Sequence, residues 1–269
     1  MAGTDTTKTS ATAPGPRIVL VRPQLGENIG AAARAMLNNA LDDMALVAPR
    51  EAWPNEAAVK MASGADAVLD KAQVFDDVET AVADLTRVYA TTARPRDMTQ
   101  RVLTPRAAVA ELRAHVAAGE AVGVLFGPER SGLTNDDLVQ AEAVIRVPLN
   151  PAYASLNLAQ AVLLVAYEWF QAGDATPEAV LETHDSRPAE KAELEGFFAR
   201  LIAGLESGGF FRSPGLKPVM IRNLRALFQR ATPTEQEVRT LHGVVSSLTG
   251  SWRGTAERRR AAQDDTVDS

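Results

Sequence analysis

The loop over residues 127–133, Gly-Pro-Glu-Arg-Ser-Gly-Leu, carries a carboxylate at Glu129 and a guanidinium at Arg130 between two glycines. It follows the apolar run 121–126, whose β-prone residues predict a buried strand. Small molecules bind at such loops, because the crevice of an open α/β sheet lies outside the carboxyl ends of its strands. Glu129 could order the loop by accepting backbone hydrogen bonds, and Arg130 could contact a phosphate or pair with Asp136. An ordinary strand-to-helix turn with surface charges is the alternative.

Two other segments have the same order of apolar run, polar loop and helix. In the first, residues 18–21 predict a strand, and Asn28 and Gly30 lie in the sequence that leads into a helix carrying Arg34. In the second, residues 144–147 predict a strand, and a polar loop containing Ser155 and Asn157 precedes the apolar helical run 158–170. Ser155 is placed to cap that helix, since its hydroxyl can accept from a backbone N–H of the first turn.

Together these segments resemble the three motifs, in order, of the SpoU branch of the SPOUT RNA methyltransferases. The matching residues are Asn28-x-Gly30-x-x-x-Arg34, Phe126-Gly-x-Glu129-x-x-Gly132-Leu133, and Pro148 through Ser155-Leu-Asn157. The remainder, residues 194–212, 219–230 and 234–248, is similar to the C-terminal extension of the TrmJ family of tRNA 2′-O-methyltransferases. This resemblance implies methylation of the ribose of cytidine or uridine at position 32, the first nucleotide of the anticodon loop.

The resemblance also implies a cofactor, a fold and an assembly. It predicts a SPOUT-type α/β fold, in which a parallel sheet ends in a C-terminal trefoil knot whose loops hold S-adenosylmethionine. It predicts a homodimer that places Arg34 of one subunit near the methyl donor of the other. Carried over to this chain, the cofactor pocket would comprise Thr91, Thr92, Ala93, Gly127, Val147, Ala154, Ser155 and Leu156.

The expected chemistry asks mainly for positioning, because the sulfonium donor is already activated. The family pattern nominates Arg34 for the ribose 2′-hydroxyl. A guanidinium has no acceptor and stays protonated, so we expect it to orient the ribose or phosphate and to stabilise the developing alkoxide. Deprotonation is then left to solvent or a nearby group. Asn28 and Asn157 would position the nucleotide or hold the loops, and without the motif Arg34 would be interpreted as a surface arginine.

Alternating apolar strands and helical stretches over residues 17–172 predict a mostly parallel sheet with helices on both faces. Residues 173–188 predict a linker, and residues 189–250 a small helical extension with a helix that begins at Thr232-Pro-Thr-Glu235. Residues 1–16 and 251–269 are expected to be flexible tails. The strands are expected at residues 18–21, 44–47, 87–90, 122–126 and 144–147.

Charge is distributed unevenly, although the net charge is −6. Residues 1–190 hold 16 Lys and Arg against 25 Asp and Glu, whereas residues 191–260 hold 12 against 6. In the basic extension, Arg222, Arg225 and Arg230 are expected near one side of a helix. Phosphate binding to tRNA is the functional interpretation of that side, and a solvated basic face is the alternative.

Composition limits the other possibilities. Cysteine is absent, and His115, His184 and His242 lack metal-ligand spacing, so we expect no protein-bound metal. No signal peptide or membrane span is apparent, and we expect a cytoplasmic protein. A methyltransferase for ribosomal RNA or another tRNA position, and a non-catalytic RNA-binding dimer, remain as alternatives. A nicotinamide-binding enzyme is remote, because Gly26-Glu-Asn-Ile-Gly30 lacks the G-x-G-x-x-G spacing.

Overall fold

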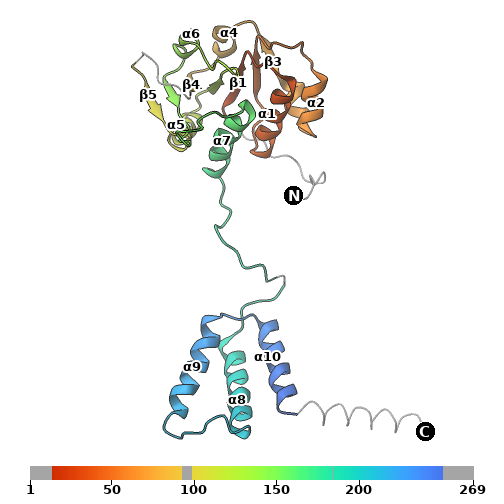
Figure 1. The fold of residues 1–269 in the computed structure, drawn as a ribbon, viewed down its shortest axis with the longest axis vertical. Helices are drawn as coiled ribbons and strands as arrows, with labels where there is room; N and C mark the ends of the chain where they lie inside the picture. Colours follow the sequence, from red (N-terminus) through yellow and green to blue (C-terminus); the bar gives the residue numbers. More distant parts are fainter. Residues whose placement is uncertain (1–13, 93–98, 184, 251–269) are drawn as a thin grey trace, which may run out of the picture. The chain divides into compact units, whose positions relative to one another are not determined.

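Among the described residues, seven parallel strands form a single sheet in the first of two compact units, and the boundary between the units falls in the sequence between Thr176 and Pro177. The structure is a computed structural model that describes residues 14–92, 99–183 and 185–250 (Figure 1). The sheet order is β3-β2-β1-β6-β4-β7-β5. The strands are β1 (Arg17–Val21), β2 (Met44–Val47), β3 (Gln73–Phe75), β4 (Arg87–Thr91), β5 (Arg101–Leu103), β6 (Val122–Phe126) and β7 (Ala143–Ile145).

The five strands expected from the sequence are present as β1, β2, β4, β6 and β7, although β7 ends at Ile145, two residues before the expected end at Val147. Their residues are mostly buried, because helices cover both faces of the sheet and leave no polar face to reveal an alternating pattern. The strands β3 and β5 were not expected. Each has only three residues, two of them exposed, so neither produces a continuous apolar run.

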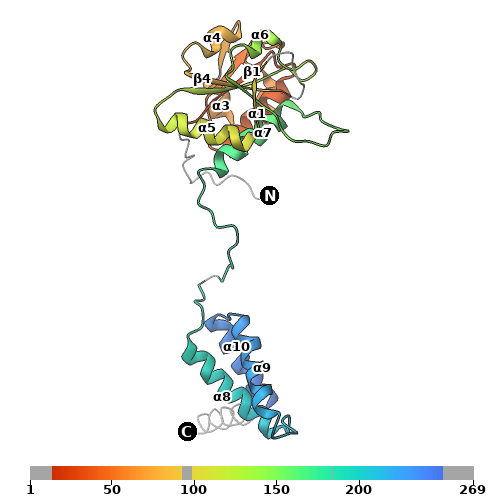
Figure 2. The same ribbon diagram turned by 90° about the vertical axis from the view of Figure 1, so that its left-hand side faces the viewer.

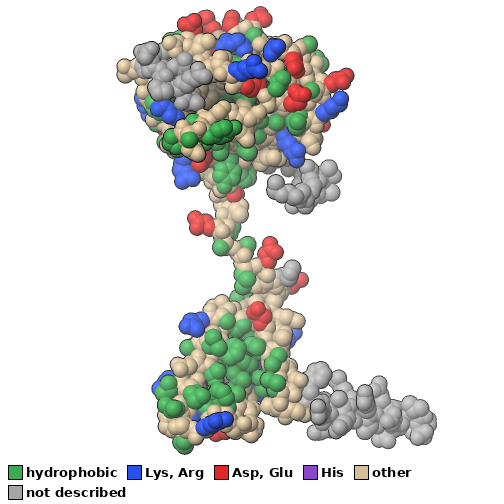
Figure 3. All heavy atoms as spheres, viewed as in Figure 1, with side chains coloured by type: hydrophobic (Ala, Val, Ile, Leu, Met, Phe, Trp, Pro, Cys, Tyr) green, Lys and Arg blue, Asp and Glu red, His purple; other side chains and the backbone are tan. Residues whose placement is uncertain are grey.

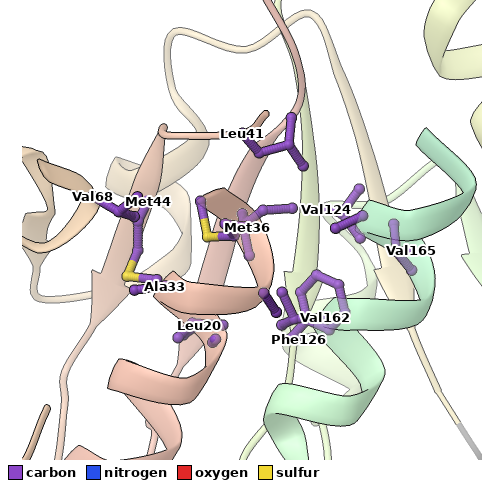
Figure 4. Packing of buried hydrophobic residues seen from close by; sticks show 14 of the residues in the cluster. Leu20, Ala33, Met36, Leu41, Met44, Val68, Val124, Phe126, Val162 and Val165 are labelled. Carbon is purple, nitrogen blue, oxygen red and sulfur yellow. The ribbon is translucent and has the colours of Figure 1, made fainter. Parts of the chain in front are cut away.

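Side-chain alternation along β1 divides the core into two clusters. Ile18 and Leu20 belong to a cluster with residues of α1 (Gly26–Asn38), α2 (Glu56–Ala62), α3 (Asp66–Lys71), α5 (Pro105–Ala117) and α7 (Leu158–Gln171). Val19 and Val21 belong to a cluster with α4 (Val78–Val82) and α6 (Asn135–Leu138) on the opposite face. Figure 4 shows the first cluster, where Met36 of α1 and Val162 of α7 pack beside Phe126 of β6.

The described residues of the second unit form three helices: α8 (Lys191–Ser207), α9 (Lys217–Arg230) and α10 (Glu235–Leu248) (Figure 2). Its buried core comprises Leu194, Phe197, Phe198, Val238 and Val245. Helix α9 contributes only partly buried residues, and Figure 3 shows hydrophobic side chains gathered on one face of this unit. The N-cap of α10 is Thr234, which forms a capping box with Glu237, so the expected start at Thr232 is two residues too early.

Parts of the sequence-based expectations lie outside the described residues. These are Ala93, His184 and the tails, apart from residues 14–16. Within the described residues, no helix is both long and apolar enough to cross a membrane.

Candidate active site

Three side chains, one from each sequence motif, form a continuous hydrogen-bonded chain at the carboxyl edge of the sheet. Asn28 Nδ2 donates to Glu129 Oε1 at 2.6 Å, and Asn157 Nδ2 donates to Asn28 Oδ1 at 2.8 Å. The backbone N–H of Gln24 donates to Glu129 Oε2 at 3.1 Å. Glu129 therefore links the loop after β6 to the segment after β1, and the backbone N–H from which it accepts belongs to that segment rather than to its own loop.

The chemistry of these groups fixes the orientation of both amides. A carboxylate can only accept, so Asn28 must present its NH₂ group to Glu129 and its carbonyl oxygen to Asn157. Asn157 then has its own carbonyl oxygen free, and this oxygen accepts from the N–H of Ala159 at 2.8 Å. Asn157 is thus the N-cap of α7, and the expectation that Ser155 caps this helix is wrong.

Glycines at three motif positions allow backbones to approach closely. A Cβ at Gly30 would lie 2.0 Å from the carbonyl oxygen of Ala58, so glycine permits α1 to pack directly on α2. A Cβ at Gly127 would lie 2.3 Å from the N atom of Leu133. Glycine at this position therefore allows the two ends of the loop after β6 to approach each other closely. Gly132 has φ +67°, a left-handed conformation that favours glycine.

A second connection joins the loop after β1 to helix α6. The Arg22 guanidinium donates to Asp137, whose carboxylate also accepts from the N–H and the hydroxyl of Thr134. The side chain of Asp137 is 6% exposed. Burial raises its pKa, but the hydrogen bonds from Arg22 and Thr134 outweigh that effect, and the net pKa is lowered.

The strand ends proposed for the cofactor lie next to one another. Thr91 Oγ1 donates to the carbonyl oxygen of Leu125 at 3.0 Å, which places the end of β4 beside the end of β6. The N–H of Thr92 donates to the carbonyl oxygen of Ile145 at 3.1 Å. Thr92 therefore lies beside the last residue of β7, two positions before Val147. In the third motif, Ala154 and Ser155 are exposed and Leu156 is half-buried.

Arg34 is not part of this cluster within one chain. It is exposed on α1 and has no hydrogen bond or ion pair with the described residues. Six residues separate it from Asn28, which corresponds to about 9 Å along the helix axis and about 120° around it. Its guanidinium therefore points away from Asn28 and is free to contact a ligand or another chain.

The other arginines differ in how available they are. Arg130 is exposed and, among the described residues, pairs with neither Asp136 nor any other acid. Arg222 and Arg230 are exposed on α9, but Arg225 is partly buried, pairs with Glu195 of α8, and lies 4.6 Å from the ring centroid of Phe198. Arg225 is therefore packed against α8, whereas Arg222 and Arg230 face solvent.

Sequence reasoning did not find Arg22, Gln24, Asp137 and Arg146 at this edge of the sheet. Gln24 acts through its backbone, so its side-chain type carries no signal. Arg22 and Asp137 are 115 residues apart, and no local spacing indicates that they pair. No group of three or more His, Asp or Glu side chains in the described part of the chain could hold a metal ion.

Family models match the chain in two places. The SpoU rRNA Methylase family matches residues 15–167, and the C-terminal domain of tRNA methyltransferase TrmJ matches residues 192–264. The chain belongs to the SpoU methylase family.

Individual relatives match along nearly their whole lengths. The tRNA (cytidine/uridine-2′-O-)-methyltransferase TrmJ of Salmonella typhimurium is 38% identical over 86% of this chain and 95% of its own length. The protein of the same description from Citrobacter koseri is 37% identical, with the same coverage. The crystal structure of TrmJ from Z. mobilis ZM4 has a TM-score of 0.77 and 48% identity, covering 87% of this chain and 99% of that one.

Proposed function

We propose that this protein is an S-adenosylmethionine-dependent tRNA 2′-O-methyltransferase that acts on cytidine or uridine at position 32 of the anticodon loop. The observation that carries the proposal is the match of both units, in order, to relatives described as tRNA (cytidine/uridine-2′-O-)-methyltransferases. The hydrogen bonds from Asn28 to Glu129 and from Asn157 to Asn28 support the proposal, because they join the three motifs in one place. We place this activity in the cytoplasm, in keeping with a tRNA substrate.

The residues at the carboxyl edge fit S-adenosylmethionine. Gly127 gives the loop after β6 a tight backbone path, and the ends of β4, β6 and β7 converge there. Thr91, Thr92, Ala93, Gly127, Val147, Ala154, Ser155 and Leu156 would hold the cofactor, mainly through backbone groups. When bound, the cofactor supplies a methyl group on a positively charged sulfur.

Within this proposal the protein's own residues orient the ribose and stabilise charge. Arg34 contacts the ribose or its phosphate and stabilises the alkoxide that develops at the 2′-oxygen. Because a protonated guanidinium cannot accept a proton, the proton passes to solvent or another group. Asn28 and Glu129 keep the loops in register, and Asn157 joins Asn28 to the start of α7. Ser155 is exposed on the loop before α7, from which it would contact the nucleotide.

The proposal includes a homodimer in which Arg34 acts on the partner's cofactor site. Arg34 points away from Asn28 in its own chain, which supports action on a second copy. Leu163, Tyr167 and Phe170 form an apolar stripe on α7, with exposed fractions of 42%, 50% and 37%. Such a stripe is suited to burial against another copy of the chain.

The proposal also includes the trefoil knot of the SPOUT fold. Strand β7 follows β6 in the chain but lies between β4 and β5 in the sheet. Strand β7 is therefore inserted between two strands that come earlier in the sequence. This strand order supports the threading of the C-terminal segment of the first unit through a loop.

The test is mass-spectrometric mapping of 2′-O-methylated nucleotides after incubation of tRNA with the protein and S-adenosylmethionine. The expected product carries one new 2′-O-methyl group at position 32, and variants of that nucleotide show whether both pyrimidines are accepted. Methylation at a different position, or only of ribosomal RNA fragments, would contradict the assigned substrate. Cofactor binding without methylation of any RNA would favour a non-catalytic RNA-binding protein.

A further inference from the structure

Arg146, directly after β7, is a half-buried cation whose charge nothing in the described protein neutralises. Its backbone N–H donates to the carbonyl oxygen of Leu103 at 2.8 Å, which fixes the residue at the end of the strand. Its Nε atom is buried and has no hydrogen-bond partner among the residues that the structure describes. A buried donor without a partner is destabilising, so such a group in a folded protein calls for an explanation.

The other half-buried arginines described in the first unit all have protein partners. Arg17 contacts Asp43 and Asp84, Arg22 contacts Asp137, and Arg87 contacts Glu120. Arg113 donates to the carbonyl oxygen of Trp169 and lies over its ring. Exposed arginines such as Arg34 and Arg130 can be hydrated instead. The Nε of Arg146 has neither a partner among the described residues nor access to water. We infer that a ligand accepts its hydrogen bond.

The position of Arg146 indicates which ligand this is. It lies between Ile145, whose carbonyl oxygen accepts from Thr92, and Val147, one of the residues assigned to the cofactor pocket. A buried nitrogen at this edge suits a small anion enclosed by the loops. A phosphate of a large RNA is better reached by exposed side chains such as those of Arg34 and Arg130.

We propose that Arg146 binds the carboxylate of the methionine part of S-adenosylmethionine. This inference rests on the proposed cofactor. A guanidinium and a carboxylate form a charge-assisted hydrogen bond, and a planar guanidinium can form two in parallel. Arg146 is then a cofactor-binding residue that selects ligands with a free carboxylate.

Calorimetry with two ligands tests the inference on the full-length protein. Unsubstituted protein should bind S-adenosylmethionine roughly 10- to 100-fold more tightly than decarboxylated S-adenosylmethionine, which lacks only the carboxylate. Arg146→Gln should weaken the binding of S-adenosylmethionine by about the same factor and change the affinity for the decarboxylated ligand less than about 2-fold. Arg146→Lys should fall between the two proteins, because it keeps the charge and loses the planar contact.

Arg106→Gln is the matched control, since Arg106 is exposed on α5 and forms an ion pair with Glu168 of α7. It should bind both ligands as the unsubstituted protein does. Equal affinity of Arg146→Gln and unsubstituted protein for S-adenosylmethionine would overturn the inference and leave the proposed function intact. An equal loss of affinity for both ligands in Arg146→Gln would also overturn the inference. A loss confined to tRNA binding would overturn it too and would assign Arg146 to an RNA phosphate. Failure of unsubstituted protein to bind S-adenosylmethionine would overturn the cofactor itself.

Discussion

The carboxylate of Glu129 accepts a hydrogen bond of 2.6 Å from Asn28, although 101 residues separate them. Asn28 in turn accepts from Asn157, so one amide connects all three motif-bearing loops. The NH₂ group of Asn28 contacts Glu129, which leaves its carbonyl oxygen for the NH₂ group of Asn157. Exchanging the oxygen and nitrogen of either amide would break two hydrogen bonds. The asparagine at position 28 is therefore required as both a donor and an acceptor.

Replacement of Asn28 by Asp should be more damaging than its size suggests. The new carboxylate would face Glu129 with no donor between them, and like charges at this separation repel. We expect a loss of about 1–3 kcal/mol in the free energy of unfolding, measured with urea. Methyl transfer should fall on the order of 100-fold, because the loops lose their register.

The double variant Asn28→Asp with Glu129→Gln is the control, since it replaces a carboxylate pair by a carboxylate and an amide. It should regain part of the stability lost in Asn28→Asp alone, as a double-mutant cycle would show. If Asn28→Asp is as stable and active as the unsubstituted protein, the hydrogen-bonded chain has no positioning role.

Replacement of Gly30 by Ala should separate α1 from α2. The added Cβ would lie 2.0 Å from the carbonyl oxygen of Ala58, and backbone cannot yield as a flexible side chain can. The expected loss in the free energy of unfolding of the first unit is about 1–3 kcal/mol or more. Gly196→Ala in α8 is the matched substitution, since nothing lies within 4 Å of its Cβ. It should stabilise the helical unit by up to about 1 kcal/mol, and equal effects at both sites would contradict the packing argument.

The sequence predicts elements better than it predicts contacts between them. The apolar runs of β1, β2, β4, β6 and β7 are visible because burial on both faces demands continuous hydrophobic residues. The helix cap at Asn157 was missed because Ser155 and Asn157 are both good caps, and the choice depends on where α7 can begin. The motif residues were found through resemblance, whereas the pair Arg22–Asp137 depends on a tertiary contact without a local pattern.

Arg225 illustrates the same limit in the helical unit. A helical wheel places it between the apolar and the solvated sides of α9, so periodicity alone cannot decide its role. The position of α8 decides it, because Glu195 and Phe198 supply a carboxylate and an aromatic ring for one guanidinium. A packed arginine of this kind contributes through contact as well as charge.

Asp137 should make stability depend on pH in the acidic range. Its net pKa lies below the ordinary value of 3.8, so its contribution to stability is present above that value and is lost as the pH falls through the folded-state pKa. In Arg22→Gln, burial still raises the pKa of Asp137, and the hydrogen bond from the guanidinium no longer lowers it. The loss of stability on acidification should therefore begin at a higher pH. Urea unfolding at several pH values below about 6 measures this shift. Asp136→Asn, at an exposed neighbouring position, should reproduce the profile of the unsubstituted protein.

Arg34→Ala should retain the fold and cofactor affinity and lose methyl transfer by on the order of 100-fold or more. Arg34→Lys should not restore activity if planar, bidentate contact matters. The proposed action on the partner chain has a separate test. Mixed dimers of Arg34→Ala with Gly127→Val, which blocks the cofactor loop, should regain activity at one of their two sites. Activity within a few-fold of normal for Arg34→Ala alone would remove Arg34 from the mechanism.

The α9 arginines should divide into two that bind RNA and one that holds the helical unit together. Arg222 and Arg230 are exposed, so replacing both by Gln should weaken tRNA binding and reduce the log–log salt slope by roughly one unit per lost phosphate contact. Arg225→Gln should instead lower the free energy of unfolding of the helical unit by about 1 kcal/mol, since it loses Glu195 and the Phe198 ring. Its salt slope for tRNA should match that of the unsubstituted protein. A slope reduced equally by Arg225→Gln would show that its ion pair opens to admit phosphate, and an unchanged slope in Arg222→Gln with Arg230→Gln would leave the basic side of α9 as a solvated surface.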